Sequence, residues 1–209
     1  MTAVAQGIRF QDDRAKARAT EAVKAFESHT SAELVITLRK HAAAYPEANL
    51  AWGALFAFVV LLYLLFFPVD FATAFMPLDV LVAFAIGRFL SSRLDPIRRL
   101  FVPRGKRRAA VDAAAKVAFV DLGVSRTVGR TGVLVYVALF EGLVGIVLDA
   151  GVTDGARAAA LGAQGTLEAA LARSDMGAFA EALEALGPSF GKTMARAADD
   201  VNELPDEVS

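Results

Sequence analysis

Hydrophobic residues follow two kinds of pattern along this chain. Near both ends, apolar positions recur at three- and four-residue spacing or form short runs, as in amphipathic helices and strands. Between these parts, residues 50–67 read LAWGALFAFVVLLYLLFF, a stretch of 18 residues without a charge that is followed by Pro68. A helix of this length is roughly 27 Å long, close to the thickness of a bilayer core. We therefore expect a membrane-spanning helix here, with Trp52 as its anchor at the interface.

A second apolar stretch covers residues 71–90, where Asp79 interrupts it and Arg88 lies near its end. We expect a second span there, and the alternative is an interfacial or re-entrant helix. Asp79 lies beside Pro77 at the start of the stretch, where its carboxylate can cap the helix and remain near water. The connection between the two stretches is short. The pattern therefore predicts a hairpin of two antiparallel transmembrane helices.

Outside this hairpin, the patterns predict helices and strands that can share one core. The expected helices cover residues 14–28, 106–122, 154–173 and 177–202, and the expected strands cover residues 33–38, 133–139 and 144–149. A lone strand leaves unpaired edges, so the first strand needs partners from beyond residue 91. We therefore expect an α/β fold: a small sheet of three or four strands covered by helices on most of both faces. The split domain occupies residues 1–49 and 91–209, and the hairpin occupies residues 50–90.

Charge is distributed unevenly, although the formal net charge of the 209 residues is only −1. Residues 91–130 hold 10 Lys or Arg against 3 Asp or Glu, whereas residues 131–209 hold 4 against 12. The cations crowd the exit of the second apolar stretch, and the loop between the stretches holds Asp70 without a Lys or Arg. The positive-inside rule then places both termini in the cytoplasm, in a protein of the inner (cytoplasmic) membrane with two spans. The cations from Arg93 to Arg108 also suit anionic lipid head groups, whereas the low net charge argues against a nucleic-acid partner.

One acidic side chain is the best candidate for a metal ligand. Asp149 ends the last predicted strand, near Gly151 and Asp154, where carboxylate oxygens could contact a divalent cation. The alternative, which we prefer, is that Asp149 caps the turn and directs the chain into the next helix. The chain contains no cysteine, which excludes thiolate zinc sites and cysteine nucleophiles. No set of residues predicts a catalytic constellation, and the possible divalent cation is the one cofactor we consider.

Other polar segments have both a structural and a functional interpretation. An anion-binding nest before a strand could be formed by Ser125, Arg126, Thr127, Arg130 and Thr131, but a polar surface loop is the simpler interpretation. His29 and His41 flank the first strand, and further ligands for a zinc site are missing. The acidic residues from Glu168 to Glu207 could attract the basic segment 93–108 of the same or another chain. A solvated helix face is the default interpretation for such a series of charges.

Three sequence motifs resemble the TPM domain family, also called TPM phosphatases. They are FESHTSAELVITL, the helix end AFVDLGVSRT, and GRTGVLVYVALFEGLVGIVLDAGV, which together cover residues 10–40 and 105–155 approximately. The chain is similar to the bacterial membrane subgroup, in which a hydrophobic hairpin interrupts the domain. The resemblance implies a TPM-like sheet. It also implies a choice of roles, because some plant thylakoid members are described as acid phosphatases and an animal member is an auxiliary protein of a receptor channel.

Two functions remain open from the sequence. The first is a membrane-anchored, non-enzymatic accessory or assembly factor that binds another membrane protein at the cytoplasmic face. The evident anchor and the lack of a catalytic constellation favour it. The alternative is a weak metal-assisted phosphatase that acts on phosphomonoesters through the loop around Asp149, and it rests on the family resemblance.

Overall fold

The computed structural model of the protein describes residues 13–67 and 73–196. The chain forms two compact units. The first, which we call the sheet unit, combines Met1–Ala42 with Arg108–Ser209, and the second, the helical unit, is Ala43–Arg107. The sheet unit is therefore built from two segments that are distant in sequence, with the helical unit inserted between them.

The sheet unit is an α/β fold with three strands, which confirms the predicted fold class and the lower of the two expected strand numbers. Its elements are α1 (Asp13–Glu27), β1 (Leu34–Arg39), most of α5 (Arg104–Asp121), the 3₁₀ turn η1 (Val124–Arg126), β2 (Val133–Ala138), β3 (Leu143–Leu148), α6 (Asp154–Ala172), α7 (Met176–Glu184) and α8 (Leu186–Gly191). The strand order is β1-β2-β3. β1 and β2 are parallel and start from the pair Leu34 and Val133, whereas β2 and β3 form an antiparallel hairpin.

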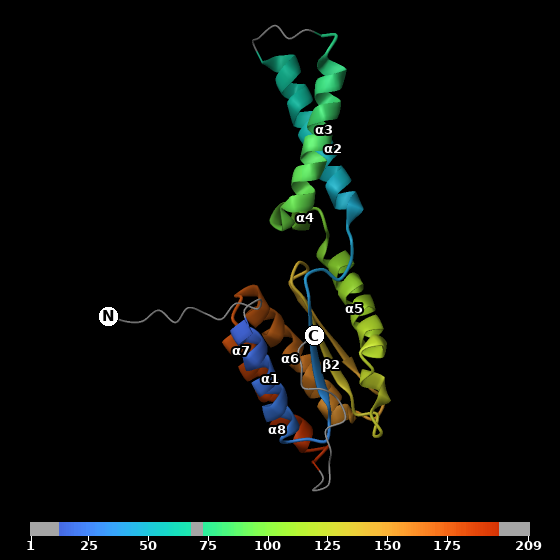
Figure 1. The fold of residues 1–209 in the computed structure, drawn as a ribbon, viewed down its shortest axis with the longest axis vertical. Coiled ribbons are helices and arrows are strands. Elements are labelled where there is room, and N and C mark those ends of the chain that lie inside the picture. The colour runs from blue at the N-terminus through green and yellow to red at the C-terminus, as the bar shows by residue number, and fades with distance from the viewer. Residues whose placement is uncertain (1–12, 68–72, 197–209) are drawn as a thin grey trace, which may run out of the picture. The chain divides into compact units, whose positions relative to one another are not determined.

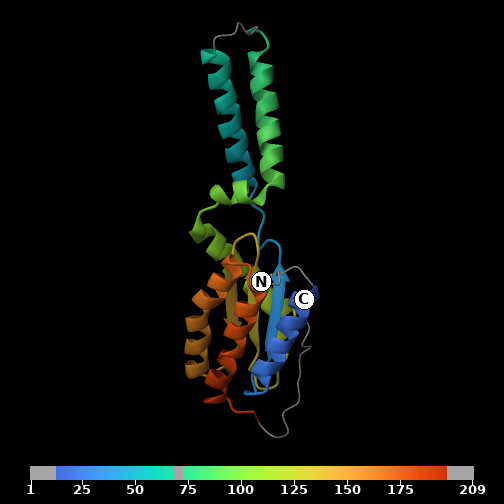
Figure 2. The ribbon, with the colours of Figure 1, turned by 90° about the vertical axis from the view of Figure 1, so that its left-hand side faces the viewer.

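Helices cover both faces of this sheet, as the near-continuous apolarity of its strands predicts. Figures 1 and 2 show α1, α6, α7 and α8 on one face and α5 on the other. β2 is buried along its whole length, and its side chains alternate between two cores. Val133, Val135 and Val137 join the core under α1, α6, α7 and α8. Leu134, Tyr136 and Ala138 join the core under α5.

The last predicted helix is wrong in its extent. We expected one helix over residues 177–202, but α7 ends at Glu184 and the short α8 ends at Gly191. Pro188 has no backbone N–H to continue a helical ladder. Gly191 also packs so closely that an added Cβ would lie 2.5 Å from the carbonyl oxygen of His29. Packing against the end of α1 therefore replaces a continuous helix with a turn, and residues 197–202 lie outside the described range.

The helical unit contains α2 (Pro46–Phe66), α3 (Met76–Arg93), α4 (Asp95–Leu100) and the first residues of α5. α2 and α3 pack against each other along their lengths. Within the described residues, α2 is the one helix that is long and apolar enough to cross a membrane, and most of its residues are not buried. α3 is less apolar than α2, because Asp79, Arg88 and Arg93 all lie within its 18 residues. Length and composition thus support one of the two expected spans.

The start of α3 also corrects the proposed cap. α3 begins at Met76, after Phe75, and no side chain caps it. Asp79 lies inside the first turn, because its own N–H donates to the carbonyl of Phe75. From there its negative charge still interacts favourably with the helix dipole. Pro77 explains why α3 starts before Asp79, because proline is well suited to the first turn of a helix.

Small residues make the contact between α2 and α3 close. The buried positions of α3 are Ala83, Gly87 and Ser91, each four residues from the next, and α2 buries Gly53 and Ala57 at the same spacing. This small-xxx-small pattern lets two helix backbones approach each other. At one end of the interface, the Ser91 hydroxyl donates to Asn49 Oδ1 over 3.1 Å. Packing of small residues and this hydrogen bond therefore stabilise the pair.

We predict that Gly87→Ala weakens the α2–α3 pair by about 1–3 kcal/mol, because overpacking forces neighbours to move. The added Cβ would lie 2.6 Å from the Cβ of Phe56. The measurement is the midpoint of thermal loss of helicity for the full chain in detergent. Gly105→Ala is the matched control, since nothing lies within 4 Å of its added Cβ. Equal midpoints for wild type and Gly87→Ala would contradict the close contact.

Candidate functional site

The candidate site lies at one end of the sheet, where β3 ends and β2 begins. Antiparallel pairing of Val133 with Leu148 brings the residues before β2 next to the residues after β3. Asp149 follows β3 and is only 4% exposed. Its Oδ1 accepts hydrogen bonds from Arg130 Nε at 3.1 Å, from Arg130 Nη2 at 2.9 Å and from the Ala150 N–H at 2.7 Å. A buried carboxylate is thus paired with an exposed arginine from the neighbouring loop.

Backbone contacts fix this pair of loops. The Gly151 N–H donates to the Arg130 carbonyl at 2.8 Å, and Arg157 Nη2 donates to the Asp149 carbonyl at 3.1 Å. A Cβ at Gly151 would lie 2.2 Å from the carbonyl oxygen of Gly129, so the approach requires glycine. Arg130 itself has a φ of 51°, in the left-handed region. The geometry agrees with the structural interpretation of Asp149, in which it orients the turn into α6.

Around Asp149, the described residues supply few of the oxygen donors that a divalent cation would need. Mg²⁺ and Ca²⁺ need several oxygen ligands. Among the described residues, no group of three or more His, Asp or Glu side chains is placed to hold a metal ion. At Asp149, Arg130 already supplies the compensating positive charge. Oδ2 of Asp149 is buried and makes no hydrogen bond within the described chain, which leaves one carboxylate oxygen with its lone pairs unused.

The loop before β2 is held by its own contacts. Thr127 is buried, and its hydroxyl oxygen accepts a hydrogen bond from the Thr131 N–H at 3.0 Å. The Arg130 N–H donates to the Thr127 carbonyl at 3.0 Å. Three of the five residues considered for an anion nest are therefore engaged within the loop, whereas Ser125 and Arg126 belong to the turn η1. This favours the simpler interpretation of a surface loop.

The two histidines do not come together. His29 precedes β1 and His41 follows it, and a six-residue strand spans about 20 Å. His29 Nδ1 lies 2.8 Å from the Ala25 carbonyl oxygen, and the His41 ring packs on Phe140 with centroids 5.1 Å apart. Each histidine therefore has a local structural environment, and the two cannot share a metal ion.

A second buried carboxylate, at the other end of the sheet, was missed by the sequence analysis. Glu141 is fully buried in the β2–β3 turn, and its Oε1 accepts a hydrogen bond from the Ala42 N–H at 3.0 Å. Burial raises the pKa of the Tyr136 phenol, and the Glu141 carboxylate raises it further. The phenol of the folded protein therefore stays neutral. Above about pH 10 the phenol of the unfolded chain ionises more readily than the buried one, so the folded state loses stability relative to the unfolded state as the pH rises past that value. The one available signal was the Glu-Gly dipeptide, whose Gly142 has a φ of 61°.

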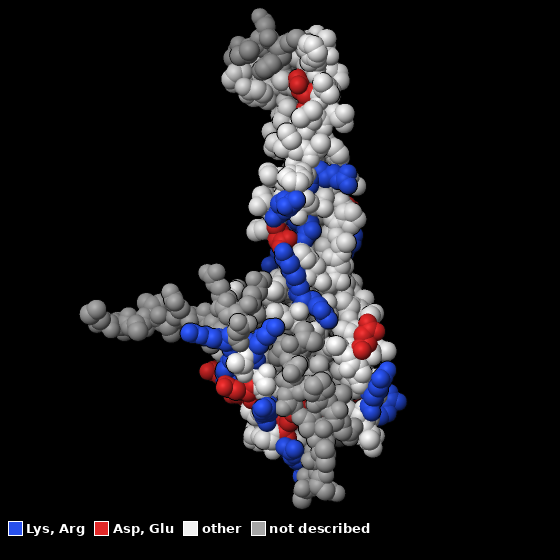
Figure 3. Space-filling model, viewed as in Figure 1, with Lys and Arg blue, Asp and Glu red and all other residues white. Residues whose placement is uncertain are grey.

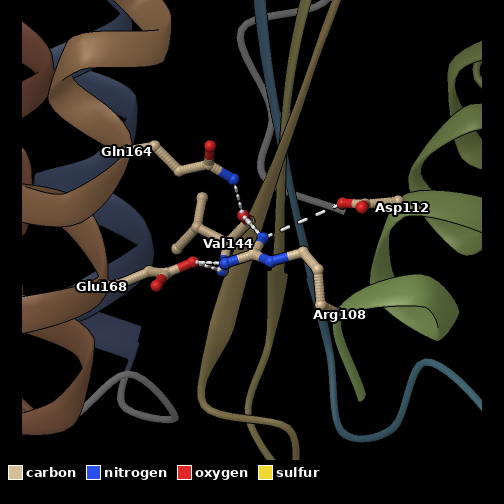
Figure 4. A network of polar contacts seen from close by, with 5 residues as sticks. All are labelled: Arg108, Asp112, Val144, Gln164 and Glu168. Carbon is tan, nitrogen blue, oxygen red and sulfur yellow. Dashed lines mark hydrogen bonds and ion pairs between the residues drawn. The ribbon is translucent and has the colours of Figure 1, made fainter. Parts of the chain in front are cut away.

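A polar network closes the outer edge of β3 (Figure 4). Arg108 from α5 and Glu168 from α6 form an ion pair across this edge. Both side chains also bind the backbone of Val144. Arg108 Nη1 donates to the Val144 carbonyl oxygen at 2.8 Å, and the Val144 N–H donates to Glu168 Oε1 at 3.3 Å. Gln164 Nε2 donates to the same carbonyl at 2.6 Å. We call these three side chains the edge clamp, since they occupy edge groups that another strand would otherwise pair with.

The edge clamp changes the interpretation of the basic segment. At Arg108, the attraction between the basic segment and the acidic C-terminal half is an internal contact, which the sequence analysis gave as the less favoured alternative. The remaining cations lie in the helical unit. Figure 3 shows the α2–α3 pair as largely white, with Lys and Arg gathered at the end that carries α4.

We predict that Glu168→Ala lowers the free energy of unfolding by about 1.5–3 kcal/mol, the range for hydrogen bonds to charged groups. Loss of the carboxylate leaves both Arg108 and the Val144 N–H without this acceptor. Asp112→Ala is the matched control: Asp112 is 3.8 Å from the same arginine, but its side chain is 49% exposed. We expect the control to stay within about 0.5 kcal/mol of wild type. Urea unfolding measures both, and equal effects would contradict the edge clamp.

Comparison with known proteins gives a likeness of fold. No protein-family model matches the chain, and no curated protein matches it. Among solved structures, the chain is similar to the NMR structure of BA42 protein from the psychrophilic bacterium Bizionia argentinensis, with a TM-score of 0.58 and 16% sequence identity. The match covers 100% of this chain and 99% of that chain. At this identity the likeness concerns the fold alone.

Proposed function

We propose that the protein is a TPM-like domain anchored in the inner membrane by a two-helix hairpin, with both termini in the cytoplasm. In this proposal it acts as a non-enzymatic accessory or assembly factor for another membrane protein. The proposal rests on one observation above all, the pairing of β1 with β2. These strands precede and follow the inserted helical unit along the sequence.

This pairing limits how often the chain can cross a membrane. β1 and β2 are hydrogen-bonded neighbours in one sheet, from Leu34 with Val133 to Arg39 with Ala138. They must therefore lie on the same side of any bilayer, and the chain between them must cross it an even number of times. If α2 crosses, α3 is the element available for the return. This supports two spans even though α3 carries more charge than α2.

The lengths and surfaces of the two helices fit this role. At 1.5 Å per residue, the 21 residues of α2 and the 18 of α3 measure about 31 and 27 Å, close to a bilayer core. Large apolar side chains point outward from both helices, among them Phe58, Val59, Leu65, Leu81, Val82 and Phe89. So large an exposed apolar surface is a liability in water and is typical of contact with lipid.

The charged residues of α3 can be accommodated near its ends. Asp79 lies in the first turn and Arg93 is the last residue. Arg88 is exposed and lies five residues before the end, from where a long side chain can reach the head groups. The cations gather beyond this end of the hairpin, which supports a cytoplasmic location for the sheet unit under the positive-inside rule.

The accessory role is favoured because the candidate site is engaged internally. The carboxylate of Asp149 is paired with Arg130, and its loop is fixed by backbone bonds. The alternative remains a weak metal-assisted phosphatase. It is favoured by the unbonded Oδ2 of Asp149, and it needs further oxygen donors from outside the set described above.

Topology can be tested with single cysteines, because the chain has none of its own. A membrane-impermeant maleimide applied to spheroplasts should label Thr73→Cys, in the connection between α2 and α3. It should label Val128→Cys, on a sheet-unit residue that is 91% exposed, only after the membrane is permeabilised. Labelling of Val128→Cys in intact spheroplasts would overturn the orientation. Labelling of neither variant before permeabilisation would overturn the hairpin as an anchor.

The accessory role predicts that the tagged protein, purified in mild detergent, retains a second membrane protein in a constant ratio. Recovery of the protein alone across growth conditions would contradict it. The phosphatase alternative is tested on the same preparation with a generic phosphomonoester and added divalent cations. Hydrolysis that is lost in Asp149→Ala would favour that alternative, and equal rates for both proteins would exclude Asp149 as its site.

A further inference from the structure

The short helix α4 and the start of α5 carry exposed cations beside an exposed leucine. We propose that this surface, which we call the collar, binds the phosphate head groups of anionic lipids. It comprises α4, the following residues and the first turn of α5, with Arg99, Leu100 and Arg104 as the residues that contact lipid. This inference rests on the proposed membrane anchor.

The collar is held firmly at one end of the α2–α3 pair. α4 packs against both α2 and α3. The Trp52 ring of α2 meets the Phe101 ring edge-on, with centroids 5.6 Å apart. Lys106 forms an ion pair with Glu47 in the first turn of α2. These contacts place the collar at the end of the exposed apolar surface, which is where head groups meet a membrane helix.

The charge of the collar is strongly positive. Residues 88–107 hold seven Lys or Arg and one acidic residue, Asp95. Arg98 pairs with Asp95 at 2.9 Å and is mostly buried, so it supports the helix and is not offered to lipid. Arg99 is exposed and forms no ion pair within the described chain, and Arg104 is exposed at the start of α5. Each such cation near an anionic surface strengthens binding about fivefold.

An apolar side chain lies beside these cations. Leu100 is 82% exposed, although it adjoins Arg99, and Leu94 at the start of α4 is 41% exposed. A helix in the interface plane inserts such apolar residues below the head groups and holds its cations at phosphate level. Charge alone would also suit an acidic protein. The exposed Leu100 favours lipid, because α4 packs against α2 and α3, whose exposed side chains are largely apolar.

The single tryptophan provides the test. Trp52 contacts the collar through Phe101, so lipid that gathers at the collar lies close to this fluorophore. The full chain is reconstituted in phosphatidylcholine vesicles that contain a low mole fraction of a bromine-labelled lipid, which quenches tryptophan on contact. One set of vesicles carries brominated phosphatidylglycerol and the other carries brominated phosphatidylcholine. We expect severalfold stronger quenching by the anionic lipid, with the difference decreasing as salt is added.

Two variants assign this preference to the collar. Arg99→Gln with Arg104→Gln should abolish the difference between the two lipids and leave quenching by phosphatidylcholine unchanged, which also shows that the chain is still inserted. Lys116→Gln with Arg126→Gln removes the same charge from exposed positions of the sheet unit and should keep the preference.

Each outcome decides between distinct claims. Equal quenching of wild type by both lipids overturns the collar as a lipid site and leaves the anchor standing. A preference that survives in the Arg99 and Arg104 variant overturns the assignment of residues. Absence of quenching by either lipid overturns the membrane anchor itself, and with it this inference.

Discussion

Backbone hydrogen bonds between β1 and β2 join two segments that precede and follow the inserted helical unit in the sequence. The fold of the sheet unit and the limit on membrane crossings both depend on these bonds. Parallel strands need a long crossover, because the chain must return to the same end of the sheet before it can pair again. In this protein the crossover contains α2, α3, α4 and α5. A membrane anchor placed within such a crossover has to leave and return on one side of the bilayer. The strand pairing therefore also limits the membrane topology that we propose.

The small sheet is protected at the places where it is weakest. A three-stranded sheet has two edges and two ends, and unpaired polar groups there are costly when buried. The edge clamp of Arg108, Gln164 and Glu168 covers the β3 edge at Val144. Asp149 closes one end of the sheet and Glu141 the other. Each of these buried carboxylates accepts a hydrogen bond from a backbone N–H group. This structural role accounts for a carboxylate at each position.

Much of the fold could be predicted from the sequence, because local patterns determined it. The strands begin and end within one residue of their expected positions, since β-branched runs bounded by glycine or charge mark them clearly. The site was predicted less completely. Asp149 was found from its place after a strand, but its partner Arg130 is 19 residues away. The edge clamp joins residues 60 apart, and no spacing rule links such residues. α4 was missed because its six residues are too few to show a helical period.

By itself, the sequence determined most of the helices and strands and the long apolar segment of α2, because hydrophobic periodicity and charge are local properties of the chain. Only the tertiary structure decided three further matters: that β1 and β2 are neighbours, that the carboxylate of Asp149 is neutralised by an arginine, and that Arg108 belongs to the sheet unit and not to the collar. Each of these depends on contacts between residues far apart in sequence. Such contacts are set by the packing of whole elements, which individual residue patterns do not encode.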